Sequence, residues 1–263
     1  MTSWCVEHAN MADAAEIARL LRCVVPEHLL NLTIWGSPLF YRYCEDSLLS
    51  QDSAAPRYYV LRSNEGVGGV ISLRRIDSEI VLDTAYVLPA LRSDFLSMQL
   101  LYEAVQCECQ DCPVDWVTWD VFSGRPRLEV WHRSLGGREE SRKGWWLRGP
   151  DTSEGYSESS ALVLRLAESE EQYARWGFSS FEIQTASHTY RVGRLPGRTF
   201  RLTNGDAASD RELLSALRDV DALSSILLMG PVERPDSSWT EITVLKRYRA
   251  PLITYLAALA QFF

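Results

Sequence analysis

The order of strand-like and helix-like segments repeats once along the chain, and this order limits the folds that the sequence can adopt. The first half reads as a strand, helical segments, three strands, a helix, a strand, a helix and a strand. The second half reads as a strand, a helix, three strands, a helix and two strands, followed by a last helix. The halves share little residue identity, so the repeat is one of element order. An α+β fold with a second, smaller α+β half is predicted.

Local signals define where these segments begin and end. Asn10 offers an N-cap to the first helix, and Ser37 followed by Pro38 is a good start for another. Strands are predicted at 3–8, 57–63, 70–75, 79–87, 115–121, 143–149, 161–166, 181–185, 189–193, 199–204, 225–230 and 240–247. Helices are predicted at 11–23, near 26, after 38, and at 94–107, 126–134, 169–176, 210–220 and from 251.

Residues 149–159, "GPDTSEGYSES", contain only turn formers and polar residues and are the best linker candidate. The predicted domains are therefore 1–148 and 160–263. The second domain is predicted to be either a degenerate repeat of the first or an extension that covers a sheet edge or forms a dimer.

The composition argues against several classes of partner. A formal net charge of −8 argues against a nucleic-acid or anionic-membrane surface, which needs clustered Lys and Arg. The N-terminus does not resemble a secretory signal, and no apolar run approaches the ~20 residues that span a bilayer. A cytoplasmic location with reduced thiols is predicted. Cys107, Cys109 and Cys112 lack a fourth ligand at zinc-ribbon spacing, so no metal is predicted.

The stretch "VLPALRSDFLSMQLL", residues 87–101, joins a strand to a helix. The first turn of a helix leaves backbone N–H groups unpaired, and together with the helix dipole these groups can bind an anion. Arg92 adds a positive charge in the loop. Residues 92–97 are therefore predicted to bind a phosphate-bearing ligand, although Arg92 can instead cap the helix or pair with a carboxylate.

This junction resembles the signature V-x-P-x-x-R/Q-G-x-G-x-G/A of the GNAT acyltransferase superfamily. Val87, Pro89 and Arg92 match it. The three glycine positions are occupied by Ser93, Phe95 and Ser97. The resemblance implies a mixed, mostly antiparallel sheet flanked by helices, with acetyl-CoA or another acyl-CoA as donor. It also implies that Val87 contacts the donor carbonyl through its backbone, and that the whole chain is similar to tandem GNAT proteins with an inactive second copy.

A second match lies in "RPRLEVWHRSLGG", residues 125–137, which aligns without gaps with the superfamily helix N-x-x-A-x-x-L-Y-x-x-x-G-F. His132 falls where the family usually has a tyrosine that protonates the departing thiolate. Trp131 takes the apolar place and Gly136 matches the glycine. The alternative for His132 is an ordinary surface or hydrogen-bonded histidine.

Acyl transfer to an amine also needs a base. Asp83 and Asp120 are the candidates, because each interrupts an apolar strand near the place where the two strands should separate. Burial there would raise the pKa of a carboxyl group. The alternative is that both carboxylates lie on the solvated face of their strands.

Two functional classes follow. The first is an N-acyltransferase that uses a CoA or carrier-bound thioester and a small-molecule amine. The second is a GNAT-like fold that has lost the donor site and serves as a binding or structural protein, or that performs another reaction. Phe95 supports the second class, because a phenylalanine adds bulk where the family has glycine.

Overall fold

The computed structural model describes residues 3–52, 54–92, 95–110, 113–124, 126–150 and 160–263. The chain forms two compact units that interleave along the sequence. Unit 1 comprises Met1–Pro26, Tyr41–Ser141 and Lys246–Phe263, and unit 2 comprises Glu27–Phe40 and Arg142–Leu245. The consecutive domain ranges expected from the sequence, 1–148 and 160–263, stay a prediction. Residues 151–159 of the predicted linker lie outside the described part of the chain.

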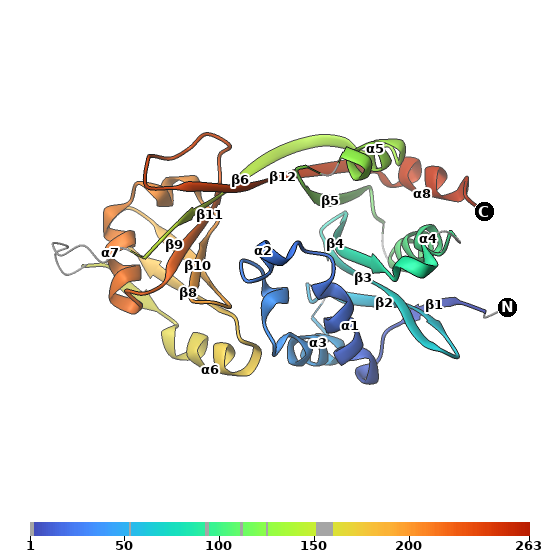
Figure 1. The fold of residues 1–263 in the computed structure, drawn as a ribbon, viewed down its shortest axis with the longest axis horizontal. Coiled ribbons are helices and arrows are strands. Elements are labelled where there is room, and N and C mark those ends of the chain that lie inside the picture. Colours follow the sequence, from blue (N-terminus) through green and yellow to red (C-terminus); the bar gives the residue numbers. More distant parts are fainter. Residues whose placement is uncertain (1–2, 53, 93–94, 111–112, 125, 151–159) are drawn as a thin grey trace. The chain divides into compact units, whose positions relative to one another are not determined.

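The strands of unit 1 follow the order β1, β2, β3, β4, β5, β12 (Figure 1). Neighbouring pairs from β1 to β4 are antiparallel, whereas β4 and β5 are parallel. The bounds are β1 Cys5–His8, β2 Arg57–Ser63, β3 Gly66–Ile76, β4 Glu79–Val87, β5 Trp116–Phe122 and β12 Thr240–Pro251. The predicted mixed, mostly antiparallel sheet is confirmed.

Helices cover both faces of this sheet. The 3-10 turn Met11–Asp13 leads into α1 (Ala14–Arg22), and the cap predicted at Asn10 is confirmed: its side chain accepts from the Ala12 N–H at 2.9 Å, and Asp13 accepts from the Asn10 N–H at 2.8 Å. α1 packs on β3 and β4, and α3 (Phe40–Leu49) follows it. α4 (Leu96–Glu108), α5 (Pro126–Ser134) and α8 (Leu252–Ala260) complete the unit.

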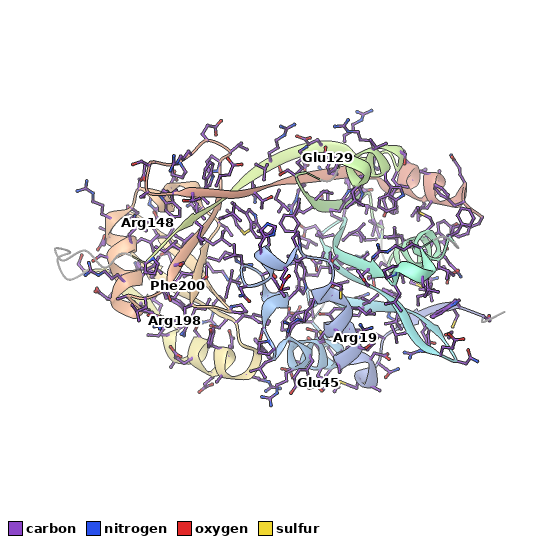
Figure 2. The ribbon with its side chains drawn as sticks, in the orientation of Figure 1. Arg19, Glu45, Glu129, Arg148, Arg198 and Phe200 are labelled. Carbon is purple, nitrogen blue, oxygen red and sulfur yellow. The ribbon has the colours of Figure 1, made fainter. Side chains whose placement is uncertain are left out.

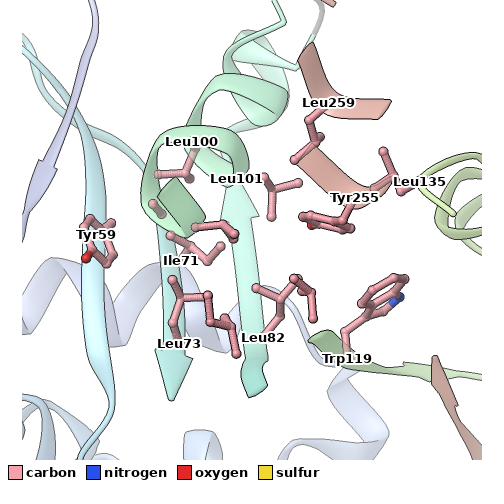
Figure 3. Packing of buried hydrophobic residues seen from close by; sticks show 14 of the residues in the cluster. Tyr59, Ile71, Leu73, Leu82, Leu100, Leu101, Trp119, Leu135, Tyr255 and Leu259 are labelled. Carbon is pink, nitrogen blue, oxygen red and sulfur yellow. The ribbon is translucent and has the colours of Figure 1, made fainter. Parts of the chain in front are cut away.

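The main core of unit 1 lies on one face of the sheet (Figure 3). It joins alternate residues of β3 and β4, such as Ile71, Leu73 and Leu82, to Leu100 and Leu101 of α4. The buried residues of α1 do not belong to this cluster, so α1 packs on the other face. We call the side of the sheet that α4 and α8 cover the core face. The side that α1 covers is the opposite face.

Unit 2 repeats the pairing scheme of unit 1. β7, β8, β9 and β10 pair in antiparallel fashion, and β10 and β11 are parallel. The strand bounds are β6 Arg138–Arg148, β7 Leu162–Leu164, β8 Ser179–Gln184, β9 Thr189–Leu195, β10 Thr199–Leu202 and β11 Ser225–Gly230. The helices are α2 Glu27–Leu30, α6 Leu166–Trp176 and α7 Arg211–Val220. Phe200 of β10 lies in the core of this unit (Figure 2).

A segment from the first half of the sequence packs in unit 2. Ser37 Oγ donates a hydrogen bond of 2.5 Å to the Trp176 carbonyl, and the Phe40 and Phe178 ring centroids lie 6.3 Å apart. Gly177 follows α6 with a φ of 74°, a left-handed conformation that suits a glycine at the end of a helix. None of the helices in the described ranges is both long and apolar enough to cross a bilayer.

Candidate functional site

The two parallel strands of unit 1 separate part of the way along their length. Their ladder runs from the pair Glu79–Trp116 to the pair Leu82–Trp119. β4 continues to Val87 and β5 to Phe122, and no further pair forms between their described residues. We call the point beyond Leu82 and Trp119, where the two strands separate, the fork.

A β-bulge in β4 accounts for the fork. Leu82 lies opposite Leu73 and Thr84 lies opposite Ser72, so Asp83 is an extra residue without a partner on β3. An extra residue bends its strand and increases the local twist. The bend directs the rest of β4 away from β5 while its pairing with β3 continues to Val87.

The two predicted base candidates flank the fork. Arg74 donates to both carboxylate oxygens of Asp83 at 2.5–2.9 Å, and Arg247 donates to both oxygens of Asp120 at 2.8–2.9 Å. The Asp83 side chain is 17% exposed and that of Asp120 is 31% exposed. The structure therefore brings Asp83 and Asp120 together as two neighbouring ion pairs.

Burial raises the pKa of Asp83 above its ordinary value, although the hydrogen bonds from Arg74 act in the opposite direction. The negative charge of Asp120 also raises the pKa of Asp83. The hydrogen bonds from Arg247 to Asp120 raise the pKa of the Arg247 guanidinium. A raised pKa is what a carboxylate needs in order to accept a proton from an amine.

His132 lies on the core face of the sheet in an aromatic cluster. Its ring centroid is 5.3 Å from that of Trp119, 4.7 Å from Trp131 and 6.0 Å from Tyr248. His132 Nδ1 is buried and has no hydrogen-bond partner among the described residues. Burial lowers the pKa of His132 to about 4, so the imidazole is neutral at neutral pH.

Strand alternation places Asp120 on the face of the sheet opposite the aromatic cluster, and Asp83, whose pKa responds to the charge of Asp120, lies beside it. Trp119 and Tyr248 belong to the core cluster, whereas Asp120 and Arg247 are their immediate neighbours in sequence and pair with each other elsewhere. Successive strand residues point to opposite faces. The fork therefore lies between two carboxylates on the opposite face and His132 with the aromatic rings on the core face.

The predicted phosphate loop lies where β4 ends and α4 begins. Val87 is buried and its carbonyl accepts a 2.9 Å hydrogen bond from Arg92 Nε. The Arg92 guanidinium also lies 5.2 Å from the centre of the Tyr86 ring. Ser97 is half-buried in the first turn of α4. Ser93 lies outside the described residues.

Phe95 occupies the N-cap position of α4. Its φ of 58° is left-handed, a conformation that glycine adopts more readily than phenylalanine. The side chain is 57% exposed, and its ring centroid lies 6.3 Å from that of Phe262. A phenylalanine side chain cannot accept a hydrogen bond from the first turn, so the start of α4 has no side-chain cap.

Sequence reasoning missed the partners of the predicted residues. Arg247 pairs with Asp120 across 127 positions of sequence, and no local signal could have identified it. The hydroxyl oxygens of Thr84 and Thr118 are buried and have no hydrogen-bond partner among the described residues. Thr84 follows the bulge directly, so its side chain is one more polar group beside the fork.

The cysteine-rich segment does not form a metal site within the described ranges. Cys107 and Cys109 are free thiols, and Cys112 lies outside the described residues. Among the residues that the structure does describe, no three His, Cys, Asp or Glu side chains gather in an arrangement that would hold a metal ion.

Comparisons with known proteins agree on the fold. No family model and no curated protein sequence matches the chain. A tandem GNAT protein from the clavulanic acid biosynthesis pathway is similar with a TM-score of 0.64 and 14% identity, over 95% of this chain and 98% of that one. A GCN5-related N-acetyltransferase from Sphaerobacter thermophilus is similar with a TM-score of 0.58 and 12% identity, over 94% of this chain and 95% of that one.

Proposed function

We propose, from the GNAT fold that this chain has, that it is an N-acyltransferase. It transfers an acetyl or other acyl group from a CoA or carrier-bound thioester to the amine of a small molecule. The observation that carries this proposal is the fork, because β4 and β5 separate between two carboxylates and a buried histidine. In acyl transfer, the amine loses a proton on one side of the carbonyl and the leaving sulfur gains one on the other.

Asp83 is the group that we expect to take the proton of the amine. Its pKa is raised, its side chain is still 17% exposed, and Arg74 fixes its orientation. Asp120 lies beside it and attracts a cationic amine to the same face. The pair is consistent with the small cationic acceptor that the acidic composition favours.

On the core face, His132 takes the position that the resemblance assigns to the residue that protonates the thiolate. A neutral imidazole with a buried, unpartnered nitrogen is able to hydrogen-bond the sulfur as it leaves. Arg92 and the uncapped start of α4 are the groups that would bind the diphosphate of the donor. The backbone of Val87 would contact the carbonyl.

The second candidate function also has a specific observation in its favour. Phe95 places a large side chain at the start of α4, and Arg92 is occupied by the Val87 carbonyl. A chain that kept these features permanently would not bind CoA. It would then be a binding or structural protein with a GNAT fold, or it would perform a different reaction.

The test is a thermal unfolding experiment with acetyl-CoA and longer acyl-CoAs at millimolar concentration, followed by detection of free CoA with a panel of small amines. A donor that binds only the folded state should raise Tm by several degrees. Arg92→Ala should reduce that rise, and His132→Ala should keep it while slowing turnover. No rise in Tm with any acyl-CoA, and no thiol release, would favour the second function.

A further inference from the structure

α8 fills the apolar space on the core face of the fork. Tyr255 and Leu259 are 1% and 0% exposed, and the Tyr255 ring centroid lies 5.4 Å from that of Trp119. Figure 3 shows these two side chains between Leu101 of α4 and Leu135, which follows α5. The face of β5 next to the fork is therefore already covered by the protein itself.

The residues after α8 reach the start of α4. The Phe262 ring lies 6.3 Å from Phe95, and the Phe263 ring lies 5.5 Å from Tyr102 of α4. From Tyr255 to Phe262 a helix of 1.5 Å rise per residue extends about 10 Å. The segment 255–263 thus connects the aromatic side of the fork with the predicted phosphate loop.

A thioester donor would have to contact both the fork and the predicted phosphate loop. This step rests on the proposed function, in which the diphosphate lies at the start of α4 and the thioester lies at the fork. The arm between them would run along the path that Tyr255, Leu259 and Phe262 now occupy. The arm and α8 cannot fill one space together.

The attachment of α8 is almost entirely apolar. Its sequence, "LITYLAALA", contains no charged residue, and its side chains make no hydrogen bond or ion pair with other described residues. The Leu252 N–H donates to the Asp115 carbonyl at 2.8 Å, and the helix has no side-chain cap. Ile253 is 83% exposed, so one side of the helix packs on nothing in unit 1. With no side-chain hydrogen bond or ion pair to other described residues, separation of the helix beyond Pro251 has to overcome only the burial of its apolar side chains.

We infer that α8 is an autoinhibitory plug, which occupies the donor path in the resting protein and leaves it when the acyl donor binds. Donor affinity then depends on how firmly α8 packs, because the donor binds only the open state. The plug also explains why a chain with the fork places the rings of Phe95 and Phe262 at the predicted phosphate loop: in the resting protein that loop is covered, and it is uncovered when α8 leaves.

A reversible disulfide between α8 and the turn that follows α5 tests the plug. A Cβ added at Gly136 would lie 3.4 Å from the Thr254 Cβ, near the ~3.8 Å typical of a disulfide. In the double variant Gly136→Cys/Thr254→Cys, the oxidised form should bind acetyl-CoA at least tenfold more weakly than the reduced form. The two forms share any strain that arises from the left-handed φ of 80° at Gly136. Gly136→Cys alone, with and without reductant, controls for the native thiols.

Hydrogen exchange on the unmodified protein keeps the inference testable if the double variant does not fold. Acetyl-CoA should increase exchange in residues 252–263 and decrease it in α4. Tyr255→Ala, which loosens the plug, should bind acetyl-CoA about tenfold more tightly, whereas Ile253→Ala on the exposed side should bind it as the unmodified protein does.

The outcomes separate the two claims. If acetyl-CoA binds while residues 252–263 stay protected, or if oxidised and reduced forms bind equally, the plug is wrong and the proposed function stands. If neither the unmodified protein nor Tyr255→Ala binds any acyl-CoA, the proposed function fails, and the plug fails with it.

Discussion

The two parallel strand pairs of this protein begin in the same way and end differently. In unit 2, β10 pairs with β11 over Thr199–Leu202, and β10 ends where this ladder ends. In unit 1, β4 continues for five residues beyond its last pair with β5, starting with the bulged Asp83. The same scheme of pairing therefore gives a closed edge in unit 2 and an open fork in unit 1.

The helices that follow these strands differ in a related way. Asp210 caps α7 by accepting from the Leu213 N–H at 3.1 Å, and it also accepts from Thr185 at 3.1 Å. An anion at that helix start would meet a carboxylate already in place. α4 begins at Phe95 and has no side-chain cap. The start of α7 therefore carries its own carboxylate cap, whereas the start of α4 has no side-chain cap.

The largest expected effect is on catalysis and comes from the fork. Asp83→Asn keeps the size of the side chain and one oxygen that accepts from Arg74, but removes the group that accepts a proton. We expect kcat to fall by about 10²–10⁴, the usual contribution of a general base. Steady-state rates of CoA release with a saturating amine measure it.

The matched control lies in unit 2. Asp210→Asn keeps an N-cap, since asparagine caps helices as well as aspartate, and it should leave kcat unchanged. If Asp210→Asn slows turnover as much as Asp83→Asn does, the contrast between the two units is wrong and the chemistry does not belong to the fork.

The next effect is on stability and depends on pH. The pKa of His132 is about 4 in the folded protein and near 6.5 when unfolded. Between these values the unfolded chain binds more protons, so the free energy of unfolding decreases as pH falls from about 6.5 to about 4. A difference of roughly 2.5 pKa units corresponds to about 3 kcal/mol. Urea unfolding at several pH values measures the loss.

His132→Gln should remove that decrease, because glutamine does not titrate. The matched control is His188→Gln at an exposed position of unit 2, because it leaves His132 and the decrease that His132 causes in place. Equal pH dependence in His132→Gln and the unmodified protein would mean that solvent reaches the imidazole and that the aromatic cluster does not bury it.

A smaller effect concerns binding of the donor. Arg92→Ala removes the cation at the start of α4, and we expect the Kd for acetyl-CoA to rise about tenfold, or about 1.4 kcal/mol. Arg211, exposed in the first turn of α7, is the counterpart in unit 2, and Arg211→Ala should not change the Kd. Isothermal titration measures both. A larger loss with Arg211→Ala would place the donor in unit 2.

Much of this architecture could be predicted because its signals are local. The capped start at Asn10, the hairpin 57–75 and the strand 79–87 follow from periodicity and turn residues over short stretches. The sequence pattern predicts strand β6 only from residue 143, yet the strand begins at Arg138. Its first residues are charged and mostly exposed, so they show no apolar alternation. Ion pairs such as that between Glu140 and Arg249 accompany the strand there, and no local pattern encodes them.

The candidate site was predictable in its positions and not in its contacts. Asp83 and Asp120 can be recognised in the sequence because a charge interrupts an apolar strand, and the ladder between β4 and β5 ends beside both. The bulge at Asp83 depends on register with β3, which a single strand does not reveal. The sequence also indicated a helix from residue 251 but not its packing place, because apolar residues fit many apolar surfaces.

The smallest expected effect tests the helix start itself. Phe95 and Arg165 are both N-caps with left-handed backbone, φ 58° and 59°, one at α4 in unit 1 and the other at α6 in unit 2. Glycine relieves the backbone strain but gains freedom in the unfolded chain, so each change to Gly should alter stability by only about 0.5 kcal/mol.

Phe95→Gly also removes the ring that contacts Phe262, and it should tighten acetyl-CoA binding several-fold. Arg165→Gly should leave the Kd unchanged. If Phe95→Gly leaves it unchanged too, the phenylalanine does not obstruct the donor, and the strongest argument for a permanently closed unit 1 disappears.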